Sequence, residues 1–189
     1  RADAKIVPRS VWGRFAKSRW VMVWFTQLIF YGTAWLQMHD RQLLLFDVEH
    51  RRFFVGPLVF YPQDFIFLTA LLVISALSLF LFTAVAGRVW CGYACPQTVY
   101  TEIFMWIERK IEGDRAARLR LAAGPWNLQR IVRTGGKHLA WLAVAGWTGF
   151  TFVGYFTPIR ELMAEISQFT LGPWELFWVG LYSLATYGN

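Results

Sequence analysis

Cysteine is the scarcest metal-binding residue type in this 189-residue chain, present only as Cys91 and Cys95. Two thiols complete neither an iron–sulfur cluster nor a structural zinc site, because each of these usually takes four protein ligands. Histidine adds only three side chains in the whole sequence. The chain as it stands therefore offers half of a cysteine site and not a complete one.

Charge is also scarce, since Asp, Glu, Lys and Arg make up 16% of the residues, against about 25% in soluble domains. Hydrophobic residues reach 56%, and aromatic residues 19%. This composition is typical of a multi-span membrane protein, in which Trp and Tyr gather at the interfaces. A net charge of +7 would suggest nucleic-acid binding in a soluble protein. Here the basic residues cluster in particular loops, so we expect a lipid bilayer as partner and no nucleic acid.

Four long apolar stretches carry no acidic residue well inside them, which argues against an ion transporter. Each is close to the length that crosses the hydrocarbon core as a helix. The charged but periodic stretch 98–111 predicts an amphipathic helix at the membrane interface. We therefore predict an all-α fold, a polytopic transmembrane helical bundle with an interfacial amphipathic helix. Its spans are expected at about 20–38, 65–86, 138–156 and 174–189.

The distribution of Lys and Arg predicts the orientation of this bundle. Residues 1–19 contain six of them, 39–64 three, 87–137 nine and 157–175 one. Because cytoplasmic loops carry the excess of basic residues, we place the N-terminus and the cysteines on the cytoplasmic side. We divide the chain into a cytoplasmic basic arm, 1–19, and a transmembrane helical domain, 20–189. The reducing cytoplasm favours free thiols or metal ligation over a disulfide.

The cysteines lie in the run Gly-Arg-Val-Trp-Cys-Gly-Tyr-Ala-Cys-Pro-Gln-Thr, residues 87–98. Pro96 suits the first turn of a helix, and a helix N-terminus together with Arg88 favours the thiolate form. Thiolate is the ligand that iron–sulfur clusters, Cu(I) and zinc prefer. Spacing alone leaves two interpretations open, namely a metal or redox site and two small hydrophobic side chains that only pack.

The three histidines are weaker candidates for metal binding. His138 lies at the start of the third predicted span, where it is either a headgroup-level side chain or a haem or metal ligand. His39 and His50 lie in the loop 39–64, which we expect to fold back on the membrane surface. For both of these, a surface histidine is the simpler interpretation.

Several long runs, beyond the cysteine motif, carry a family resemblance. The motif continues into Thr101-Glu102-Ile103-Phe104-Met105-Trp106-Ile107-Glu108-Arg109, and further matching runs cover residues 61–65, 147–162 and 185–189. Together these resemble the membrane part of the cytochrome c oxidase accessory proteins of the CcoG, FixG or RdxA type. The resemblance covers nearly the whole chain.

In that family the chain continues past this end, with a second Cys-x3-Cys-Pro motif and a ferredoxin-like domain holding two 4Fe-4S clusters. A last membrane span and an outer immunoglobulin-like domain follow. The resemblance therefore implies that this chain is truncated before the ferredoxin-like domain. With the second motif, Cys91 and Cys95 would bring four thiols to one cytoplasmic boundary.

The resemblance implies an iron–sulfur electron carrier of the bacterial inner membrane. Its activity would be oxidoreductase activity, the cytoplasmic reduction of Cu(II) to Cu(I) during assembly of the C-family (cbb-type) oxidase. Copper would be the substrate, and oxidase assembly factors or copper chaperones and transporters the partners, with an electron donor that the sequence does not identify. The alternative is a non-catalytic assembly or scaffold subunit, in which Cys91 and Cys95 only hold a metal or pack.

Overall fold

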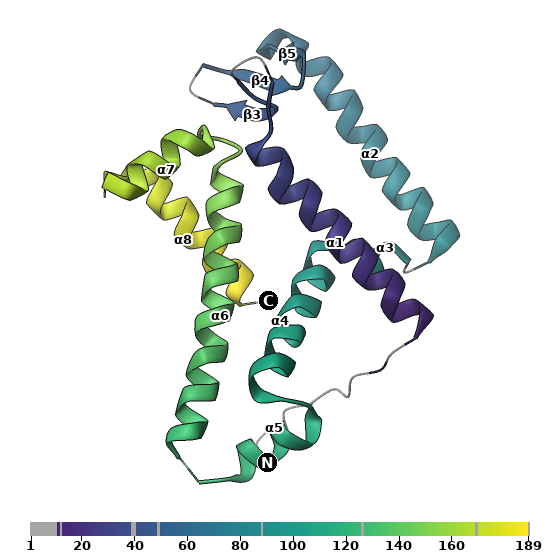
Figure 1. Ribbon diagram of the computed structural model, residues 1–189. Helices are drawn as coiled ribbons and strands as arrows, with labels where there is room; N and C mark the ends of the chain where they lie inside the picture. Colours follow the sequence, from purple (N-terminus) through teal and green to yellow (C-terminus); the bar gives the residue numbers. More distant parts are fainter. Residues whose placement is uncertain are drawn as a thin grey trace.

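The structure is a computed structural model that describes residue 11 and residues 13–38, 41–48, 50–87, 89–125, 127–168 and 170–188. Long helices dominate it, and short strands gather at one end, beside the ends of α1 and α2 (Figure 1). Two helices begin with proline in the first turn, where its missing N–H leaves no bond unmade. The α-helices are α1 Arg14–Trp35, α2 Phe65–Ala86, α3 Val89–Tyr93, α4 Pro96–Glu112, α5 Arg115–Ala123, α6 Leu128–Val153, α7 Ile159–Gln168 and α8 Pro173–Tyr187.

The prediction of an all-α fold is wrong for the segment after α1, which forms two small antiparallel sheets. One pairs β1 with β2, and the other has the order β3-β4-β5. A 3-10 turn, Pro62–Asp64, then leads into α2. The strands are β1 Gln37–Met38, β2 Arg41–Gln42, β3 Leu44–Asp47, β4 Arg52–Val55 and β5 Leu58–Phe60.

Side-chain and backbone hydrogen bonds hold these strands against the turn between α6 and α7. Gln42 is buried, and its side chain donates to the carbonyl of Gly154 at 2.7 Å and accepts from the N–H of Ile159 at 3.2 Å. The N–H of Phe46 donates to the carbonyl of Tyr155 at 2.7 Å. Because these bonds join residues more than 100 positions apart, local sequence patterns do not predict them.

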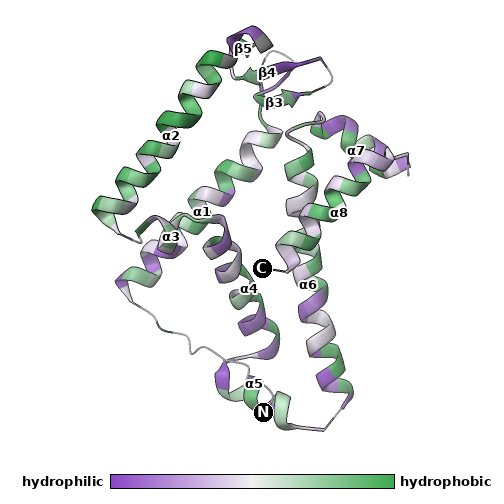
Figure 2. Cartoon of the chain, turned by 180° about the vertical axis from the view of Figure 1, so that it is seen from behind, coloured by the Kyte–Doolittle hydropathy of each residue, from purple (hydrophilic) through white to green (hydrophobic). Residues whose placement is uncertain are grey.

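The predicted polytopic transmembrane bundle is also wrong. Within the described residues, one helix, Ile66–Ala86, is long and apolar enough to cross a membrane by length and composition. It coincides with the span expected at 65–86. This helix lies at the outside of the molecule, and none of its apolar stretch is buried. Its residues are almost all hydrophobic (Figure 2).

The other three expected spans fail because their helices begin and end elsewhere. The segment 20–38 leaves the helix at Trp35 and enters β1. Residues 138–153 of the third expected span lie in a helix that begins ten residues earlier and includes charged residues such as Lys137. Residues 174–187 of the fourth expected span belong to a 15-residue helix, only about 22 Å long.

The core lies where α6, α7 and α8 meet the last turn of α1. Its buried cluster consists of Ala34, Phe150, Val153, Ile159 and Leu162. The helices α6 and α8 approach so closely at Gly149 that a Cβ there would lie 2.4 Å from the Ser183 hydroxyl oxygen. The helix α1 is joined to this unit by the hydroxyl pairs Tyr31–Thr148, at 2.9 Å, and Thr33–Tyr155, at 2.6 Å.

A second buried unit, made of charges, joins α4, α5 and α6. The carboxylates of Glu108 and Glu112 face Arg118 and Lys137, and all four side chains are at most 8% exposed. Arg118 lies 2.5 Å from Glu108, and Lys137 lies 2.8 Å from Glu112. The crossed pairs, Arg118–Glu112 at 3.5 Å and Lys137–Glu108 at 3.7 Å, close the network. The acidic face of α4 therefore packs on α5 and α6, which corrects its predicted placement at a membrane interface.

Replacing Lys137 by Met is expected to lower the free energy of unfolding by about 3–5 kcal/mol, because the change leaves a buried carboxylate without its partner. Lys17→Met is the matched control, since Lys17 is exposed and makes no ion pair within the described residues. Denaturant unfolding followed by tryptophan fluorescence measures both. Equal stability of the two variants would show that the network contributes nothing.

Candidate functional site

The cysteine motif forms the connection between α2 and α4. The chain leaves α2 at Gly87, whose φ of 64° lies in the left-handed region that favours glycine. It then forms the short helix α3, which carries Cys91 and contacts α1, α2 and α4. Arg88, predicted to favour the thiolate form, lies outside the described residues. The motif is therefore held among three longer helices.

Cys91 and Cys95 are both free thiols, but their surroundings differ. Cys91 is exposed on α3, whereas Cys95 is half-buried and occupies the N-cap position of α4. Its side chain makes no capping hydrogen bond. Cys95 therefore directly precedes the N-terminus of α4, where the first N–H groups have no partner within the helix.

Three hydrogen bonds fix the backbone between the two cysteines. The N–H groups of Ala94 and Cys95 both donate to the carbonyl of Trp90, at 2.9 and 3.1 Å. The hydroxyl of Thr98 donates to the carbonyl of Cys91 at 2.5 Å and so joins α3 to the first turn of α4. Trp90 also packs edge-on against Phe82 of α2, with ring centroids 6.4 Å apart. The sequence predicted the pair of thiols but not these contacts.

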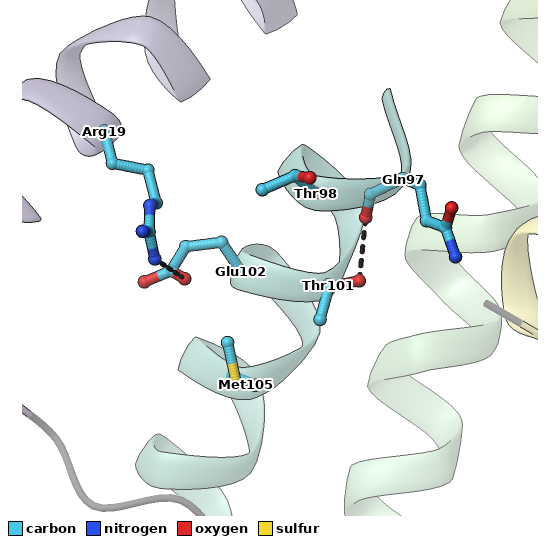
Figure 3. Close-up of a pocket in the computed structure, with 6 residues that line it drawn as sticks. All are labelled: Arg19, Gln97, Thr98, Thr101, Glu102 and Met105. Carbon is cyan, nitrogen blue, oxygen red and sulfur yellow. Dashed lines mark hydrogen bonds and ion pairs between the residues drawn. The ribbon is translucent and has the colours of Figure 1, made fainter. Parts of the chain in front are cut away.

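A cavity of about 340 Å³ opens beside the first turns of α4 (Figure 3). Glu102 points across it to Arg19 of α1, with Nη1 and Oε2 3.5 Å apart, and also lies 3.8 Å from Arg109. This pairing joins the basic start of α1 to the helix that follows Cys95. Glu102 and Arg19 were missed as site residues because they are 83 positions apart in the sequence, so no local pattern indicates that they pair.

His138 lies in an aromatic cluster between α6 and α8. Its Nδ1 is 2.9 Å from the hydroxyl oxygen of Tyr187, and its ring packs edge-on against Trp141 at 5.4 Å. None of its described contacts is with Cys91 or Cys95, so the structure does not bring the predicted ligands together. The prediction that His138 binds a metal is left untested by these contacts.

The other two histidines add no metal ligand set. His50 is exposed, and its Nδ1 lies 2.9 Å from a carboxylate oxygen of Asp47. His39 lies outside the described residues. In the part of the chain that the structure describes, no group of three or more His, Cys, Asp and Glu side chains could hold a metal ion. These residues therefore provide two thiols and cannot complete a four-thiolate cluster by themselves.

Replacing Thr98 by Val removes the bond between α3 and α4, and we expect it to weaken binding of Cd²⁺, a soft-metal probe, to the two thiols. The loss of one hydrogen bond, about 1 kcal/mol, corresponds to about fivefold in affinity. Thr101→Val is the matched control, because the Thr101 hydroxyl donates to the Gln97 carbonyl of its own helix. Thiolate-to-metal absorption measures the titration. Equal affinities in both variants would contradict the positioning role of Thr98.

Comparison with known proteins places the motif inside a known domain. Residues 67–113, which include both cysteines, match the family model of a 4Fe-4S binding domain. This match supports an iron–sulfur cluster as the cofactor. No solved structure matches the chain significantly.

Similar proteins are found in two bacteria. The chain is 40% identical to the nitrogen fixation protein FixG of Rhizobium meliloti (strain 1021), covering 97% of this chain and 36% of the relative. It is 41% identical to protein RdxB and 38% identical to protein RdxA of Cereibacter sphaeroides, covering 85% and 95% of this chain. It spans 35% and 39% of those two relatives. The resemblance inferred from the sequence is confirmed, and the chain belongs to the FixG/RdxA family.

Proposed function

We propose that Cys91 and Cys95 are thiolate ligands of an iron–sulfur centre in an electron-transfer protein. The observation that carries this proposal is the position of the two free thiols inside the segment that matches a 4Fe-4S binding domain. The exposure of Cys91 supports it, because a thiol on the surface can reach a cofactor or partner that this chain shares with another segment. The N-terminus of α4 supports it too, since a helix N-terminus stabilises negative charge on sulfur.

The remaining ligands of this centre would come from outside the described residues. A 4Fe-4S cluster takes four thiolates, whereas this chain contains two cysteines. Its relatives are more than twice as long as the part that the chain matches. We therefore assign to Cys91 and Cys95 half of a site that is completed in the full-length protein.

For the full-length protein we propose cupric reductase activity in the assembly of the C-family (cbb-type) oxidase. Cu(II) would be the substrate and would accept one electron, supplied by an iron–sulfur centre of the full-length protein, to become Cu(I). Cu(I) is a soft ion that thiolates bind well, so the group that receives it would have to offer soft ligands such as thiolate or thioether. Oxidase assembly factors or copper chaperones would then receive the ion.

We further propose that α2 attaches the protein to the bacterial inner membrane. Its 21-residue apolar stretch would be about 31 Å long, which matches the hydrocarbon core. Cys91 follows its end by five residues, so the thiols would lie at a membrane boundary. The nine Lys and Arg residues within 87–137 support a cytoplasmic position for that boundary.

Replacing Cys91 and Cys95 by Ala in the full-length protein is expected to abolish Cu(II) reduction, because the two ligands are lost. A Cu(I)-specific chelating dye measures the product. The double variant Ser75→Ala, Ser78→Ala is the matched control, since both serines are exposed on α2 and remote from sulfur chemistry. Unchanged reduction in the cysteine variant would instead favour the non-catalytic scaffold.

A membrane-impermeant maleimide is expected to leave Cys91 unmodified in intact cells and to modify it in inside-out vesicles. Cys91 is the suitable reporter because it is the exposed member of the pair. In a Cys95→Ser variant, mass spectrometry of the peptide that contains Cys91 measures the modified fraction of that one thiol. Modification in intact cells would place the motif on the outer side and contradict the proposed orientation.

A further inference from the structure

A cavity of about 860 Å³ lies at the end of the molecule that carries the strands, between β3, the end of α6, α7 and α8. Figure 1 shows these elements together at the end opposite α5. Its volume is within the range of small-molecule sites, about 300–1,000 Å³. Neither Lys nor Arg contributes to its described lining. The cavity is separate from the cysteine motif and plays no part in the proposed electron transfer.

One wall of the cavity is aromatic. Trp174, Trp178 and Tyr182 are spaced four residues apart and so share one face of α8. Phe152 of α6 packs against Tyr182 with ring centroids 3.9 Å apart, and Phe156 lies beside Phe152 at 5.5 Å. Aromatic faces carry negative electrostatic potential and attract cations.

The cavity lining also contains acidic side chains. Glu161 and Glu165 are four residues apart on α7, and Glu175 lies in the first turn of α8. None of these three carboxylates has an ion-pair partner within the described part of the chain. By contrast, the Asp47 carboxylate pairs with His50, its Oδ2 lying 2.9 Å from Nδ1. Three carboxylates therefore line the same cavity as these rings, without an ion-pair partner among the described residues.

Glu165 provides an independent sign of a missing partner. Its Oε2 is buried and accepts no hydrogen bond from the described residues. A buried acceptor without a partner costs free energy, and so does a carboxylate without a counter-charge. A cation in the cavity would supply the missing counter-charge.

We propose that this cavity binds an organic cation, an amine or a quaternary ammonium group. The lining favours this class because the carboxylates supply counter-charge and the rings supply cation–π contacts. A bare metal ion fits less well, since the described residues contain no group of three or more His, Cys, Asp and Glu placed to hold one. Glu165 and Trp178 are the residues that this site depends on most.

Choline and its neutral isostere 3,3-dimethyl-1-butanol test the proposal in the full-length protein. The two molecules have nearly the same shape, so a difference in binding reports the charge. We expect saturable choline binding by equilibrium dialysis, and binding of the isostere that is weaker by about tenfold or more. No saturable choline binding, or equal binding of the two, would overturn the proposal.

Variants locate the binding site. Glu165→Gln and Trp178→Leu are each expected to weaken choline binding by about tenfold, because one removes the charge and the other a ring. The matched controls Asp114→Asn and Trp24→Leu change exposed residues outside the cavity and should leave the affinity unchanged. Cys91→Ala should also leave it unchanged, which separates this site from the proposed redox function. Equal losses in the cavity variants and their controls would contradict the location.

Discussion

The buried network of Glu108, Glu112, Arg118 and Lys137 holds α4 in place against α5 and α6. The charges of the two carboxylates and the two cations cancel, so the network buries no net charge. The residues come from three helices and span 30 positions of the sequence, so the network forms only when all three helices are docked. The position of α4, and with it the position of Cys95 at its N-cap, depends on this balance.

The two ends of α4 are thus fixed by different interactions. The far end is held by the charge network, while the near end is joined to α3 by the hydroxyl of Thr98 and to α1 by the pair Arg19–Glu102. Between these fixed points, Cys91 stays exposed and Cys95 half-buried. This arrangement leaves one sulfur accessible, which suits the proposed ligand pair, whose further thiolates would come from outside the described residues.

The sequence predicted the parts of the structure that depend on local pattern. The pair of thiols, the apolar helix α2 and the helix after Pro96 are all visible in composition and spacing. The prediction of a polytopic bundle was wrong because it relied on the apolar content of each stretch. Apolar content does not show where a helix begins and ends. Leu128–Val153 carries Lys137 in its interior, and that charge is tolerated because Glu108 and Glu112 lie beside it.

The strands and the acidic cavity were missed for a related reason. In the sequence, Gln42 is one polar residue within a predicted loop. Only the folded structure shows that it bonds to Gly154 and Ile159. Glu161, Glu165 and the aromatic residues of α8 belong to separate stretches of sequence, and only the docking of α7 and α8 around one cavity gives them a common role. Partners that are distant in sequence decide whether a polar residue is a surface residue or part of a site.

The role of the two cysteines as cluster ligands is tested most directly by the iron content of the full-length protein, measured with electron paramagnetic resonance after reduction. The wild type should contain iron and give a cluster signal, and the variant lacking both sulfurs should lose the iron of one cluster, about four atoms per chain. Unchanged iron and an unchanged spectrum in that variant would contradict the assignment of Cys91 and Cys95 as ligands.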